Sequence, residues 1–245
     1  DNFITVFLSP ENIPQYLSCE QYIKNKLNEV ISSGGHFVYI GGNHLSILPI
    51  LSAYREHKFN LLFLTFDSHI DADPSSLLGK ERKHETISIS NYLSLFLEKE
   101  SPIKFVHIGS KHPLRISLSN LNLTIFTVQD LLFHGENFIE SSLNKIINLE
   151  KFDYLHIDID LDVLDHSIMR ATFDPSSMGL TLHQLLKIMR FAIDRLPLIG
   201  VDIVEYNPRI DPHIDYEEVC LRLFENMVYI IRESEINRKL WFSEK

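Results

Sequence analysis

The chain has 245 residues, of which 44% are apolar, and its formal net charge at pH 7 is −10. This length fits one large domain with a substantial core, and the negative charge argues against a general nucleic-acid or anionic-membrane surface. No stretch approaches the roughly 20 apolar residues of a membrane span, and the first residues lack the basic segment that opens a signal peptide. We therefore expect a soluble, cytoplasmic protein in which Cys19 and Cys220 are unpaired thiols.

Short apolar runs alternate with segments of helical period along the whole chain. The predicted strands are rich in β-branched and aromatic residues and cover 4–8, 36–42, 61–66, 103–109, 123–128, 153–160 and 198–206. The predicted helices lie between and after them, at 19–32, 45–57, 86–99, 137–149, 181–196 and 216–236. Strands that are apolar on both faces are typical of a parallel sheet covered by helices on both sides. Because no linker interrupts this alternation, we predict a single α/β domain over residues 1–245.

Polar residues break the apolar pattern where four of the predicted strands end. They are Asn43 with His44, then Asp67 with His69 and Asp71, then the run from Asp158 to Asp165, and finally Glu205. In open parallel sheets, ligand sites form outside the carboxyl ends of the strands. We therefore expect these four groups to converge on one crevice.

The first acidic group lies in the segment "FDSHIDAD", where Asp67, His69 and Asp71 occupy alternating positions. Alternating residues of an extended chain point to one side. A carboxylate–imidazole–carboxylate row suits a hard or borderline dication. The competing interpretation is a polar strand end with an Asx turn before Pro74, and this segment alone leaves both open.

The second acidic group lies in "HIDIDLDVLD", where His156, Asp158, Asp160 and Asp162 alternate with apolar residues. Three neighbouring carboxylates repel one another and resist ionisation when buried, so they need cations. A water-facing edge strand is the alternative, but the apolar residues on the other face disfavour it. This segment therefore favours a metal site. His44, which follows two glycines at an equivalent strand end, becomes a further candidate ligand.

Four ordered segments resemble the motifs of one family. GGNH (41–44), DSHID (67–71) and DIDLDVLD (158–165) look like the GGDH, DAHxD and SxDxDxxDP motifs of the ureohydrolases, the arginase–agmatinase superfamily, and DIVEYNP (202–208) is similar to its late strand motif. The resemblance covers residues 36–212, and four ordered motifs are far more specific than one. It implies the three-layer α/β arginase fold and a binuclear manganese centre with two Mn²⁺ ions per chain.

Carried over position by position, the resemblance implies six metal ligands: His44, Asp67, His69, Asp71, Asp160 and Asp162. The acidic run also permits Asp158 and Asp160 as its pair. We prefer Asp160 and Asp162 because the residues that follow then match the family's tail, and Asp158 takes the position of a family serine. Two dications about 3.5–4 Å apart can activate water for attack on a guanidinium carbon, which is a poor electrophile.

We expect Asp71, His84 and Glu205 to take part in catalysis. The family's equivalent of Glu205 pairs with the substrate's guanidinium, a charge-assisted contact; a surface acid at a strand end is the alternative interpretation. His84 lies where arginases keep a proton-shuttling histidine and could act as a general acid. Glu85 replaces the glycine that usually follows, so a histidine in a surface loop is the alternative.

Asp73 is the departure from the family that bears on the substrate. Arginases place asparagine there, in a loop that reads the α-carboxylate of free arginine, and an aspartate would repel that group. We therefore expect poor activity on free L-arginine and favour an arginine residue within a peptide, which would yield ornithine and urea. The alternatives are an agmatinase-like or other guanidino or formimino hydrolase, and a metal-binding homologue without turnover. Family members are often trimers or hexamers, which leaves a homo-oligomer open.

Overall fold

The computed structural model describes residues 13–73, 77, 87–98, 101–112, 121–212 and 214–243. Within them, one sheet of parallel strands has the order β1-β6-β5-β2-β3-β4. The strands are β1 (Phe37–Ile40), β2 (Leu61–Phe66), β3 (Ile103–Ser110), β4 (Leu123–Thr127), β5 (Tyr154–Asp160) and β6 (Leu198–Val204). These match six predicted strands to within two residues at each end. The predicted strand at 4–8 lies outside the described residues.

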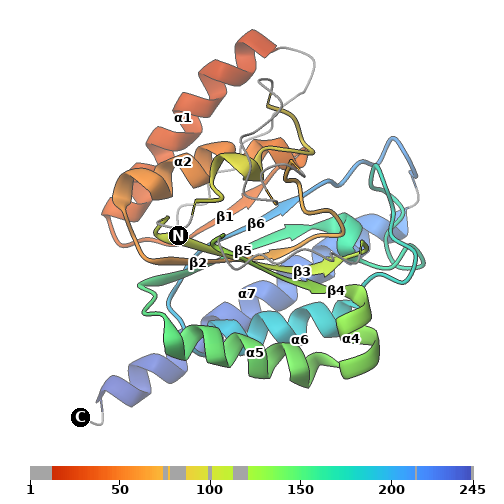
Figure 1. Ribbon diagram of the computed structural model, residues 1–245. Helices are drawn as coiled ribbons and strands as arrows, with labels where there is room; N and C mark the ends of the chain where they lie inside the picture. Colours follow the sequence, from red (N-terminus) through yellow and green to blue (C-terminus); the bar gives the residue numbers. More distant parts are fainter. Residues whose placement is uncertain are drawn as a thin grey trace.

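Helices cover both faces of this sheet (Figure 1). One face carries α1 (Ile13–Ser32) and α2 (Leu48–His57), and the other carries α4 (Val128–His134), α5 (Glu136–Leu149), α6 (Leu182–Ile193) and α7 (Ile214–Ser243). The predicted three-layer α/β fold is therefore confirmed. None of the helices in the described part of the chain combines the length and the apolar character that a membrane span requires.

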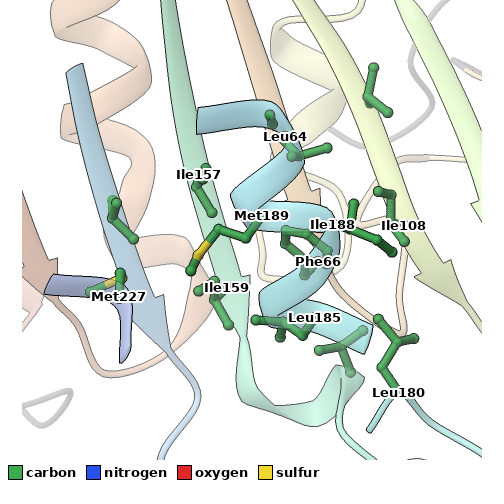
Figure 2. Packing of buried hydrophobic residues seen from close by; sticks show 14 of the residues in the cluster. Leu64, Phe66, Ile108, Ile157, Ile159, Leu180, Leu185, Ile188, Met189 and Met227 are labelled. Carbon is green, nitrogen blue, oxygen red and sulfur yellow. The ribbon is translucent and has the colours of Figure 1, made fainter. Parts of the chain in front are cut away.

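The layer between the sheet and α6 shows why β2 and β5 lie at the centre. Leu185, Ile188 and Met189 of α6 point toward Phe66 of β2 and Ile159 of β5 (Figure 2), and all five side chains are fully buried. Burial of each such side chain contributes roughly 1.5–3 kcal/mol. This packing anchors the two strands whose carboxyl ends carry the acidic segments.

The predicted helix at 86–99 is wrong. Among the described residues 87–98, the only helical segment is the short 3₁₀ turn η2 (Leu93–Leu95). The side chain of Asn91 accepts the backbone N–H of Ser88 at 2.8 Å, and the N–H of Leu93 donates to the carbonyl of Asp71 at 3.0 Å. The second bond uses a backbone donor that a helix would need. It also holds the segment against the end of β2.

Helix α4 was missed by the sequence prediction. Its N-cap is Thr127, whose hydroxyl and the Asp130 carboxylate form a reciprocal capping box. The segment "TVQD" carries this signal, although aspartate replaces the usual glutamate. The predicted strand at 123–128 had extended one residue into the helix. The other five predicted helices are present, and the one at 45–57 begins with a 3₁₀ turn, η1 (His44–Ile47).

The sheet order brings the polar strand ends together. β1, β6, β5 and β2 are consecutive neighbours, so the residues that follow them meet at one edge of the sheet. In the register of the sheet, Asp158 of β5 lies opposite Thr65 of β2 and Asp202 of β6. The residues two positions further along β2 and β5, Asp67 and Asp160, therefore lie close together at the ends of the strands.

Candidate metal centre

His44 is the first residue of η1 and follows β1 after a short turn. The turn before it requires glycine at position 41, because a Cβ there would collide with the Ser46 hydroxyl. The His44 side chain is fully buried. Its backbone N–H donates to Glu205 Oε1 at 2.7 Å, which links the ends of β1 and β6.

Nδ1 of His44 lies 3.2 Å from each of three carboxylate oxygens, which belong to Asp67, Asp71 and Asp160. Within the part of the chain that the structure describes, this buried nitrogen makes no hydrogen bond. Ligand atoms around an octahedral dication lie ~3 Å apart, since bonds of about 2.1 Å meet at right angles. The spacing therefore fits a cation held between these four side chains.

A second group of ligand atoms adjoins the first. Asp67, His69 and Asp162 have ligand atoms within 4.8 Å of one another, and so do His44, Asp67 and Asp71. Asp67 belongs to both groups: its Oδ2 faces His44 at 3.2 Å, and its Oδ1 lies 3.7 Å from Nδ1 of His69. One carboxylate shared between two clusters fits a pair of adjacent dications.

Backbone N–H groups orient the carboxylates of both clusters. Asp67 Oδ1 accepts from the N–H of His69 at 2.6 Å, and Asp160 Oδ1 accepts from the N–H of Asp162 at 2.8 Å. The N–H of Ser68 donates to Asp162 Oδ1 at 3.1 Å and so joins the tips of β2 and β5. The site is therefore held by the chain itself before any ligand binds.

Two of the candidate residues have left-handed backbone conformations. Asp71 has φ 51° and Glu205 has φ 66°. Such strain costs of order 1–3 kcal/mol in a non-glycine residue and clusters at functional sites. Hydrogen bonds hold both residues, because the carbonyl of Asp71 accepts from Leu93 and the N–H of Glu205 donates to Gly42.

Three carboxyl groups around the clusters resist ionisation. Burial, reinforced by neighbouring carboxylates, raises the pKa of Asp71 to about 6 and that of Asp158 to about 7. The same causes raise the pKa of Asp160 well above its usual value. The nearby histidines do not offset the burial and crowding of these acids, and a bound dication would favour their ionised forms.

Asp67 and His69 behave in the opposite way. Burial alone would raise the pKa of Asp67, but the neighbouring imidazoles of His44 and His69 hold it well below its usual range. The adjacent carboxylates of Asp162 and then of Asp67 raise the pKa of His69 to about 11. Of the two carboxylates in the cluster of His44, Asp67 and Asp71, Asp67 is therefore the one that holds its charge more firmly.

A chelated sample should lose stability as the pH rises from about 4 to about 7. Asp71, Asp158 and Asp160 have folded pKa values above the unfolded value of about 3.9. Their contribution to the free energy of unfolding is complete below the unfolded pKa and is lost as the pH rises through the folded pKa. Urea unfolding at about pH 5 and about pH 7.5 measures this difference. Excess divalent metal should restore stability mainly at the higher pH, where it does not compete with protons; a chelated protein equally stable at both pH values contradicts the expectation.

The residues of the two alternatives for the acidic run lie at different places around His44. Asp160 and Asp162 lie on the side of the two clusters. Asp158 lies on the opposite edge of the His44 ring, with both carboxylate oxygens 3.1 Å from Nε2. Its position therefore suits an orienting role more than that of a ligand shared with the other carboxylates.

The remaining candidates are placed as follows. Glu205 is half-buried at the rim of the clusters, and burial raises its pKa; among the described residues no hydrogen bond reaches its Oε2. Asp73 is only 3% exposed. It would therefore affect a substrate through its electrostatic charge and not through direct contact at the protein surface. His84 lies outside the described residues.

Sequence reasoning missed three residues around the two histidines. The Tyr92 hydroxyl lies 3.0 Å from Nε2 of His44, and Asp174 Oδ2 lies 2.9 Å from Nε2 of His69. Lys111 in turn lies 2.6 Å from Asp174 Oδ2. Asp174 is 105 residues from His69, so no local spacing could have indicated the contact, and Tyr92 lies in the segment wrongly predicted as a helix.

Comparisons with known proteins agree on one family. Residues 6–228 match the family model described as "Arginase family". The chain is 28% identical over 185 residues to an agmatinase of Neisseria meningitidis serogroup C and 27% identical over 183 residues to an agmatinase of Photorhabdus laumondii. Both alignments cover 75% of this chain and 55% of the relative. The chain thus spans about half the length of the curated relatives it matches.

Solved structures show the same fold. A formimidoylglutamase from Bacillus subtilis superposes with a TM-score of 0.73 at 17% identity, covering 93% of this chain and 69% of the other. An arginase from Helicobacter pylori superposes with a TM-score of 0.69 at 17% identity, covering 93% of this chain and 84% of the other. At such low identity the likeness concerns the fold alone.

Proposed function

Because the chain belongs to the arginase family, we propose that it is a binuclear manganese hydrolase that cleaves the guanidino group of an arginine side chain to ornithine and urea. We favour an arginine residue within a peptide as the substrate. The observation that carries this proposal is the pair of histidine–carboxylate clusters that share Asp67, with Glu205 hydrogen-bonded to the backbone of His44 beside them.

The proposed metal ligands are His44, Asp67, His69, Asp71, Asp160 and Asp162. Four carboxylates and two imidazoles without a thiolate suit Mn²⁺, and the buried Nδ1 of His44 faces its carboxylates at ligand-to-ligand spacing. When bound, two dications supply a water nucleophile at neutral pH. The surrounding N–H groups of the chain keep the carboxylates in place.

Three side chains have proposed roles in the reaction itself. Glu205 accepts the guanidinium of the substrate through the oxygen that His44 leaves open, and so orients the carbon that is attacked. Asp71 accepts a hydrogen bond from the attacking water and aims it. His84 donates a proton to the leaving amine. A neutral amide would gain less from Glu205, which supports a guanidino substrate.

The acidic surroundings support a substrate without a free carboxylate. A like charge about 8 Å from Asp73 costs about 2 kcal/mol at an effective dielectric constant of about 20, or roughly 30-fold in binding. A peptide-bound arginine avoids this cost because its carboxyl group is in an amide bond. Agmatine avoids it as well, and the curated relatives named agmatinase make it the second candidate.

A substrate panel tests this proposal directly. With added Mn²⁺, kcat/KM for urea release from an end-blocked arginine peptide is expected to exceed that for free L-arginine by roughly 30-fold, with agmatine and guanidinobutyrate as further arms. Asp73→Asn should reduce the ratio of kcat/KM for the peptide to kcat/KM for free L-arginine. Absence of urea from every compound, despite two bound metal ions, would refute the ureohydrolase. Efficient turnover of free arginine would overturn the substrate preference alone.

A further inference from the structure

Each of the two histidines in the clusters contacts a carboxylate that belongs to neither cluster. Nε2 of His44 meets Asp158, and Nε2 of His69 meets Asp174 at 2.9 Å. In both rings Nδ1 faces carboxylates of the clusters instead. The same orientation therefore occurs twice, on residues that follow different strands.

This orientation has a chemical consequence for metal binding. A neutral imidazole carries one proton, so Nδ1 can offer its lone pair to a cation only when the proton is on Nε2. A carboxylate at Nε2 accepts that proton in a hydrogen bond, selects this tautomer and increases the basicity of the ligand nitrogen. Asp174 is placed to do this for His69.

The surroundings of Asp158 and Asp174 differ sharply. Asp158 is fully buried, whereas the side chain of Asp174 is 56% exposed. Water competes for an exposed carboxylate and weakens its contacts. Lys111, with a side chain only 22% exposed, lies 2.6 Å from Asp174 Oδ2 and holds the pKa of this carboxyl below its usual value. Lys111 thus keeps Asp174 charged and in position.

We propose that Asp174, held by Lys111, is a positioning residue that sets the affinity of the Asp67–His69–Asp162 cluster for its metal ion. This inference rests on the proposed binuclear function. Asp174 lies on the segment between η3 (Leu161–Val163) and α6, and it reaches the cluster only through His69. Any effect of Asp174 on metal binding is therefore expected in the half of the centre that contains His69.

A contact with the substrate is the other role open to Asp174, since Phe173 beside it is 84% exposed. The two roles differ in what they change. A substrate contact alters KM and leaves the affinity for metal unchanged. A positioning role alters the affinity for one of the two metal ions in the absence of substrate.

Metal titration of the full chain tests the proposal. Isothermal titration with Mn²⁺ should show that Asp174→Asn weakens one of the two sites by roughly 10- to 100-fold and leaves the other site within about twofold. The electron paramagnetic resonance spectrum should then show isolated Mn²⁺ where the unaltered protein shows a coupled pair. Lys111→Met should act in the same direction with a smaller effect, and Asp174→Glu should restore part of the affinity.

The controls separate the possible failures. Asp215→Asn changes another exposed aspartate, on α7, and should leave both sites unchanged. An Asp174→Asn protein that binds both ions like the unaltered chain would overturn the positioning role, and so would a change confined to KM. An unaltered chain that never binds two ions would refute the proposed function itself. Thermal unfolding of the chelated variants verifies that each one folds.

Discussion

Asp67→Asn is expected to abolish the proposed binuclear centre and to reduce kcat by roughly 1,000-fold, because a metal ion lowers the reaction barrier by several kcal/mol. The two oxygens of Asp67 face different clusters. Asparagine keeps the shape but offers one uncharged oxygen, so it can serve at most one of them. Metal content after equilibration with excess Mn²⁺ should fall from two ions per chain to one or fewer.

Asp202→Asn is the matched control for this change. Asp202 is equally buried, and its Oδ1 contacts Nε2 of His156, outside both clusters. Asparagine can preserve that contact, so this variant should retain two Mn²⁺ ions. If the Asp67→Asn protein still binds two ions and has a kcat near that of the unaltered protein, the proposal that Asp67 is shared by two metal ions is wrong.

Glu205→Gln is expected to lower kcat/KM for a guanidino substrate by roughly 100-fold without changing metal content. A hydrogen bond to a charged group contributes about 1.5–3 kcal/mol, and a planar guanidinium can make two such bonds to one carboxylate. Glutamine can still accept the backbone N–H of His44 through its carbonyl oxygen. Steady-state kinetics and metal analysis on the same preparation measure the two effects separately.

Two further variants test this assignment. Glu205→Asp keeps the charge but withdraws it by one methylene, so it should lose activity through misplacement and still bind both ions. Glu218→Gln changes an exposed glutamate on α7 and should be neutral. Undiminished activity of Glu205→Gln on guanidino compounds would show that this carboxylate does not recognise the substrate. Loss of metal in that variant would instead make Glu205 part of the metal centre.

Some elements of the fold were predictable because their causes are local. The bounds of β2 match the prediction, since Leu61–Phe66 is a continuous apolar run buried on both faces. The helix predicted at 86–99 is absent because tertiary contacts hold this segment in another conformation. Its apolar residues suggested a helix, but Asn91 turns the chain and the carbonyl of Asp71 captures the N–H of Leu93.

The candidate site divides in the same way. A parallel sheet brings the carboxyl ends of its strands to one edge, so the sequence pattern could indicate that His44, Asp67 and Glu205 lie near one another. The order of strands then made them neighbours. The left-handed backbone at Asp71 and Glu205 had no sequence signal, because aspartate and glutamate there look like any strand-end acid.

By itself, the sequence determined the alternation of strands and helices and the acidic character of the strand tips, because both are written in the spacing of nearby residues. Only the tertiary structure decided which nitrogen of each histidine faces the clusters and which carboxylates lie behind them. Asp158 and Asp174 reach these rings from 114 and 105 residues away. Such contacts depend on how β1, β5 and β2 pack together, and no local periodicity encodes that arrangement.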